Sequence, residues 1–105
     1  MTLHANNYEG LKLSIQASGI NINEYIVRKI DGMIKKLRKH LPGIDWIDIY
    51  LKTTQDASRP IMATVRFGVP GPDVVASDSG SSWKTLLKNI EKRIMRQVEK
   101  RKRWL

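Results

Sequence analysis

Five basic side chains recur at every fourth position near the end of this sequence, and groups of this kind bind anions. They are Lys84, Lys88, Lys92, Arg96 and Lys100. In a helix this spacing forms one row, and at about 100° per residue the row is centred opposite the apolar side chains of the same segment. Like charges four residues apart repel by roughly a few tenths of a kcal/mol per pair, so the row does not help folding. We infer that it meets a polyanion.

The charge of the whole chain is concentrated in a similar way. Its 19 Lys and Arg residues outnumber 10 Asp and Glu residues, and fifteen of the nineteen lie in residues 23–41 and 82–105, with only four acidic residues. One charged outer face is usual for a surface helix, but two neighbouring basic helices predict a surface for RNA. The residues predicted to bind it are Arg28, Lys29, Lys35, Lys36, Lys39, Lys84, Lys88, Lys92, Arg93, Arg96, Lys100 and Arg101.

Groups suited to catalysis or metal binding are sparse. The chain has no cysteine, and its two histidines, His4 and His40, have no carboxylate at metal-ligand spacing. Asp45 and Asp48 are three residues apart on a predicted strand and therefore face opposite sides. The remaining candidates are expected in turns or as helix caps, and they are Asp56, Asp73, Asp78, Ser79, Ser81 and Ser82. We expect no catalytic residue, no metal and no cofactor.

The apolar pattern predicts the elements that carry these side chains. Alternation predicts strands over residues 11–17, 44–54, 61–69 and 74–77. Three- and four-residue steps predict helices over residues 23–41 and 82–105, with Asn23 as the first N-cap and Pro42-Gly43 as the stop. Pro70-Gly71-Pro72-Asp73 is predicted to be a tight turn, and Asp78 to Ser82 offer caps for the second helix.

The order of these elements indicates an α+β fold with a single two-layer domain. The order is β-α-β-β-β-α, and the apolar stripes are buried best if both helices pack on one face of a four-stranded sheet. The first strand–helix–strand unit should be parallel, and an antiparallel meander should follow. We expect residues 1–10 to be a flexible arm and residues 11–105 to be the domain. No signal peptide or membrane-spanning run is visible, so an intracellular protein is expected.

The open face of the sheet is a competing site for RNA. Trp46, Tyr50 and Lys52 share one side of a predicted strand, and Met62 and Arg66 share the matching side of the next. Bases stack on aromatic side chains of this kind in some RNA-binding sheets. A sheet covered on one side only also leaves such residues half exposed without any ligand.

With these elements in place, the chain resembles the ribosome hibernation-promoting factor family, which includes protein Y and sigma-54 modulation proteins. The resemblance spans about residues 11–103 and rests on the element order and on a strand ending in Val75-Ala76-Ser77. It also rests on residues 93–98, Arg-Ile-Met-Arg-Gln-Val, which look like the family's basic-Leu-x-Arg-Gln-Leu pattern, and on the Lys/Arg-rich end. Ser81-Ser82-Trp83 departs from an acidic residue and Tyr in the family, and Trp83 is expected to be core.

The resemblance implies a cytoplasmic factor that binds the small ribosomal subunit in stationary or stressed bacterial cells. It would occupy the channel of mRNA and of the A- and P-site tRNAs, with the basic helices on rRNA, and inhibit translation without chemistry. Its partners would be rRNA and the ribosome, with no membrane and no small-molecule substrate, and it would be a monomer off the ribosome. Long members add a second domain, so the chain, which ends at Leu105, resembles a short form.

Two other functions stay open. The first is a general double-stranded RNA-binding module, whose α-β-β-β-α layout is similar, although the start of the last helix here lacks a dense basic cluster. The second is a protein-interaction modulator, for example of a transcription factor, whose basic face meets an acidic partner.

Overall fold

The alternating segments form one mixed sheet, with strands in the order β1-β2-β3-β4-β5. β2 pairs in parallel with β3, and the other neighbours are antiparallel. The four predicted strands are β2 (Lys12–Ser18), β3 (Trp46–Thr53), β4 (Ile61–Gly68) and β5 (Val74–Gly80). The helices are α1 (Glu24–His40) and α2 (Trp83–Trp104), and a two-residue strand β1 (Thr2–Leu3) pairs with β2. The predicted fold class and element order are confirmed.

The computed structural model describes the backbone of residues 2–3, 11–41, 43–69 and 71–104, and the side chains of residues 11–41, 43–69 and 71–100. The flexible arm expected over residues 1–10 therefore lies outside the described residues, apart from Thr2–Leu3. Pro42 and Pro70, which the sequence assigns to a helix stop and a turn, lie outside them as well.

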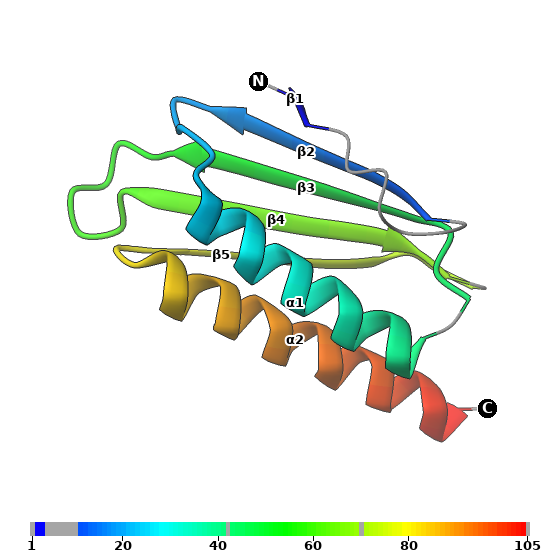
Figure 1. The fold of residues 1–105 in the computed structure, drawn as a ribbon. Coiled ribbons are helices and arrows are strands. Elements are labelled where there is room, and N and C mark those ends of the chain that lie inside the picture. The colour runs from blue at the N-terminus through cyan, green and yellow to red at the C-terminus, as the bar shows by residue number, and fades with distance from the viewer. Residues whose placement is uncertain (1, 4–10, 42, 70, 105) are drawn as a thin grey trace.

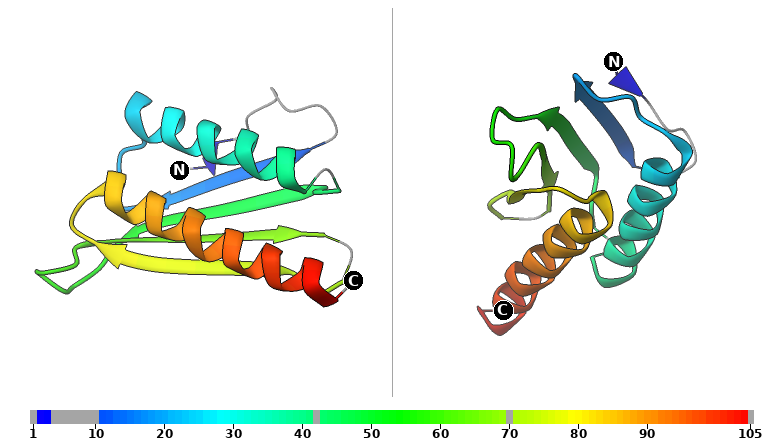
Figure 2. Two further views of the ribbon diagram at one scale, coloured as in Figure 1. Left: turned by 90° about the horizontal axis from the view of Figure 1, so that it is seen from below. Right: turned by 90° about the vertical axis from the view of Figure 1, so that its left-hand side faces the viewer.

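Both helices cover the same face of the sheet and run side by side in the same direction (Figures 1 and 2). The buried side chains of β3 alternate as predicted, with Ile47, Ile49 and Leu51 at most 1% exposed. α1 buries Ile26, Ile30, Met33, Ile34 and Leu37, at the three- and four-residue steps that predict this helix, and Leu41, the last residue of the predicted stripe, is the C-cap and only partly buried. The apolar steps of α2 predict a stripe of Trp83, Leu87, Ile90, Ile94 and Val98. Leu86 joins this stripe, and Trp83 packs against the core partly buried. The stripe then comprises Leu86, Leu87, Ile90, Ile94 and Val98.

Local signals set the ends of α1 and β2. Asn23 is the N-cap of α1, as predicted, because its Oδ1 accepts a hydrogen bond from the Ile26 N–H at 2.9 Å. Gly19, after β2, has φ +72°, a conformation that favours glycine. α1 ends at His40, and the Leu41 N–H, at the C-cap, donates to the Leu37 carbonyl at 2.7 Å.

The prediction for the end of β5 is wrong. Asp78, Ser79 and Gly80 were assigned to a turn with helix caps, but they continue β5 and pair with Ala63, Met62 and Ile61 of β4. Neither Asp nor Gly favours a strand, so their place in the ladder depends on tertiary contacts. The turn before α2 is correspondingly shorter.

Candidate nucleic-acid interface

The basic row of α2 faces solvent along its whole length. Its five members are all exposed, and no described acidic group forms an ion pair with any of them. Consecutive members are about 6 Å apart along the helix, so the row extends for about 24 Å. We call this set the α2 row: Lys84, Lys88, Lys92, Arg96 and Lys100.

A groove runs between α1 and α2. It consists of two adjoining hollows of about 310 and 300 Å³, which share Lys88 and Glu91. Their other charged lining residues are Lys29, Lys36, Lys84, Lys92, Arg96 and Glu99, over apolar Met33, Leu87 and Met95. Six basic groups against two acidic ones give the groove a positive charge, which concentrates anions near it.

Part of the positive charge in this groove is already paired. Lys36 on α1 forms an ion pair with Glu91 on α2, at 3.1 Å between Nζ and Oε1. Lys29 Nζ lies 5.6 Å from the centre of the Tyr25 ring, a cation–π contact. The first contact links the helices, and the second places an aromatic ring, 37% exposed, next to the groove.

The outer ridge of α1 carries the other predicted residues of this helix. Arg28, Lys35 and Lys39 are exposed and lie opposite the buried stripe. Lys35 pairs with Asp31 one turn away at 3.1 Å, and because both side chains face solvent this pair contributes little to stability. We call the outer ridge, Lys29, Lys36 and the α2 row together the basic face. Arg101 belongs to it by sequence, but its side chain lies outside the described residues.

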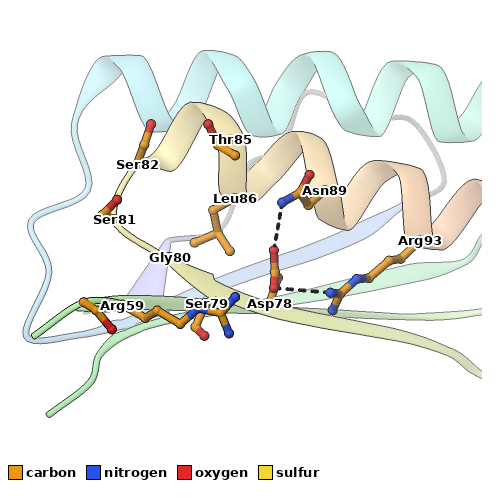
Figure 3. A pocket seen from close by; sticks show the side chains of 11 residues that line it. Arg59, Asp78, Ser79, Gly80, Ser81, Ser82, Thr85, Leu86, Asn89 and Arg93 are labelled. Atoms are coloured by element: carbon orange, nitrogen blue, oxygen red, sulfur yellow. Dashed lines mark hydrogen bonds and ion pairs between the residues drawn. The ribbon is translucent and has the colours of Figure 1, made fainter. Parts of the chain in front are cut away.

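Among the predicted residues whose side chains the structure describes, Arg93 alone points elsewhere. Its guanidinium donates to the Ser77 carbonyl of β5 and forms an ion pair with Asp78 at 3.4 Å. It therefore contacts the sheet edge, away from the groove with α1. Figure 3 shows Asp78 between Asn89 and Arg93, beside a polar hollow of about 330 Å³ at the start of α2.

The open face of the sheet is less available than the sequence suggests. The Arg66 guanidinium lies 5.9 Å from the centre of the Trp46 ring and also forms an ion pair with Asp73 at 2.9 Å. The indole also lies against Gly68, so Trp46 is only partly exposed. Tyr50, which is 46% exposed, is then the main free aromatic surface of this face.

The carboxylates in the described part of the chain form no group that could hold a metal ion. Asp56 sits in the β3–β4 loop, as predicted, and the Ser58 hydroxyl and N–H both donate to it, which lowers the pKa of this carboxyl below its usual value. His40 is exposed at the end of α1, and His4 lies outside the described residues. In the part of the chain that the structure describes, no three His, Asp or Glu side chains are placed to hold a metal ion.

A comparison with protein-family models matches residues 13–105 to the family described as Sigma 54 modulation protein / S30EA ribosomal protein. The chain belongs to this family. The resemblance predicted from the sequence is thus confirmed, and membership in the S30EA family indicates a ribosome-associated protein. A comparison with curated proteins gave no match.

Solved structures show the same fold as this S30EA family member. A ribosomal subunit interface protein from Coxiella burnetii matches with a TM-score of 0.73 at 12% identity, covering 86% of this chain and 96% of that one. The N-terminal domain of Thermus thermophilus Protein Y matches with a TM-score of 0.67 at 15% identity, covering 82% and 92%. None of the described helices is long and apolar enough to span a membrane.

Proposed function

We propose that this protein binds the small ribosomal subunit through its basic face and inhibits translation in stationary or stressed cells. In this proposal, α1 and α2 lie on rRNA in the channel that mRNA and the A- and P-site tRNAs use. Inhibition follows from occupancy of the channel, in the cytoplasm, and requires no cofactor and no catalytic residue. The protein acts as a monomer before it binds.

The observation that carries the proposal is the α2 row together with the groove beside it. Five exposed basic groups about 6 Å apart provide regular contacts for a phosphate backbone. Family membership suggests that the polyanion is the ribosome, since the description of the family includes a ribosomal protein. The open sheet face supports RNA binding less well, because Arg66 and Trp46 already contact each other there.

Charge reversal on α2 tests the proposal directly. We expect the variant K88E/K92E/R96E to remain folded and to lose binding to vacant ribosomes in sucrose-gradient sedimentation. Three lost charge-assisted contacts at roughly 1.5 kcal/mol each correspond to an affinity about 1000-fold lower. Addition of mRNA and initiator tRNA should also release the wild-type protein, because they compete for the channel.

A matched control carries the same change of charge on other surfaces. K12E/K52E/R59E alters exposed residues of β2, β3 and the β3–β4 loop, and it should sediment with ribosomes as the wild type does. Ribosome binding by the folded α2 variant would contradict the proposal. Binding of free duplex RNA but not of ribosomes would favour the general RNA-binding module instead.

A further inference from the structure

One flank of α2 carries a row of polar side chains that contact β5. Asn89, Arg93 and Gln97 are spaced by four residues. Asn89 and Arg93 point toward β5 (Figure 3), and Gln97 contacts the same strand. Gln97 Nε2 donates to the Val75 carbonyl at 2.9 Å, and Arg93 donates to the Ser77 carbonyl. Asn89 Nδ2 donates to the Asp78 carboxylate at 3.2 Å, and Arg93 pairs with the same carboxylate.

The spacing of these contacts follows from the geometry of the two elements. Two residues along a strand span about 6.6 Å, and four residues along a helix span about 6 Å. Because α2 runs opposite to β5, residue 93 meets carbonyl 77 and residue 97 meets carbonyl 75. A helix in this orientation can therefore contact successive outward carbonyls of an edge strand.

We propose that Asn89, Arg93 and Gln97 form a polar seam that closes the free edge of β5 and fixes the rotation of α2, so that Arg93 positions the basic face instead of binding phosphate. β5 is the last strand of the sheet, and an edge strand with free carbonyls can pair with other chains. The seam occupies two of these carbonyls with side chains.

The burial of the Asp78 side chain explains why the Arg93 charge is needed at the β5 edge, although Arg93 itself is about half exposed. The Asp78 side chain is only 9% exposed, and a carboxylate in such a place requires a partner. Arg93 and Asn89 supply the contacts to it, from consecutive turns of α2. A phosphate that recruited Arg93 would leave the carboxylate without its ion pair.

The seam also connects the sheet to the proposed binding surface. Rotation of α2 about its axis would move Asn89, Arg93 and Gln97 off β5, and the α2 row would turn by the same angle. This second part of the inference rests on the proposed function, whereas the closure of the β5 edge does not.

The experiment compares two identical substitutions on one helix. R93Q and R96Q each remove one guanidinium, three residues apart, and only Arg93 touches β5. We expect R93Q to lower the thermal unfolding midpoint by about 4–8 °C and to speed amide exchange in β5, while R96Q leaves both unchanged. In a double-mutant cycle, the losses of stability caused by R93Q and D78N should not add, because both substitutions remove the same ion pair.

A substitution that keeps the net charge tests the hydrogen bonds of the polar seam apart from any effect of charge. Q97L keeps the net charge and removes the donor to Val75, so we expect faster exchange at that end of β5. Equal midpoints and equal β5 exchange for R93Q, R96Q and the wild type would overturn the seam.

Ribosome affinity as a function of salt tests the positioning role. We expect R96Q to reduce the slope of log K against log salt by about 1, and R93Q to keep the wild-type slope. A slope reduced equally by R93Q would make Arg93 a phosphate contact and refute the positioning role. Wild-type protein that does not bind ribosomes would refute the proposed function, and the stability cycle would still decide the seam.

Discussion

At the scale of single residues, Gly68 and Trp46 show how one missing side chain shapes the open face of the sheet. The two residues are paired across β3 and β4, and a Cβ atom at Gly68 would overlap the indole ring. The ring can lie against β4 at this position because Gly68 has no side chain. Arg66 then lies over the ring, which leaves little of the indole for a ligand.

We therefore expect G68A to destabilise the protein by about 1–3 kcal/mol, because the indole must move off the sheet or strain the strand. Urea denaturation followed by Trp fluorescence measures this change. The control is G32A, on the exposed side of α1, where an added Cβ has no atom within 4 Å and should stabilise the helix by about 1 kcal/mol. Equal stabilities of G68A and the wild type would show that the indole does not need this space.

The residue scale is also where the sequence was least informative. Periodicity identified Arg93 and Arg96 as basic residues of one helix, and it gave them the same predicted role. It could not show that the carboxylate of Asp78, fifteen positions before Arg93, would be buried beside that residue. The exposure of the α2 row was predictable, because it depends only on the helical period and the apolar stripe.

At the scale of elements, α1 begins where a local signal and the apolar stripe agree. Asn23 accepts a hydrogen bond from the Ile26 N–H, and Glu24 is the acidic residue of the first turn. We expect N23A to lower the free energy of unfolding by about 1 kcal/mol in urea denaturation, with N23D close to the wild type.

A matched substitution two residues upstream controls for the loss of an Asn side chain. Asn21 is exposed and lies outside α1, so N21A should leave the stability within about 0.5 kcal/mol of the wild type. If N21A and N23A were equally destabilising, the cap would not be the cause.

The start of α1 and the end of β5 differ in what a sequence can predict. The cap of α1 is a contact between residues three apart, so the local sequence contains it. The last three residues of β5 have a weak strand propensity and were therefore predicted to be a turn. They are held in the ladder by β4 and, at Asp78, by Asn89 and Arg93 of the following helix. Tertiary contacts overrode the local preference.

At the scale of the whole molecule, the two layers carry different charge. The helical segments, residues 23–41 and 82–105, have fifteen basic and four acidic residues, whereas the rest of the chain has four basic and six acidic residues. Because both helices cover one face of the sheet, this difference becomes a difference between two sides of the molecule (Figure 2). A polyanion is therefore attracted to the helical side.

This asymmetry predicts how salt acts on ribosome binding. Each phosphate neutralised by the protein releases counterions, so the logarithm of the binding constant falls linearly with the logarithm of salt concentration, with a slope of about 0.7–0.9 per phosphate. We expect K88Q/K92Q, on the α2 row, to reduce the magnitude of this slope by about 1.5, because two contacts are lost.

K12Q/K52Q provides the comparison, since it lowers the net charge from +9 by the same amount but on the open face of the sheet. If the position of the basic residues determines ribosome binding, this variant keeps the wild-type slope, because its lysines do not touch phosphate in the complex. Equal reductions in the two variants would mean that net charge alone drives binding. The arrangement of basic residues on α1 and α2 would then have no part in recognition.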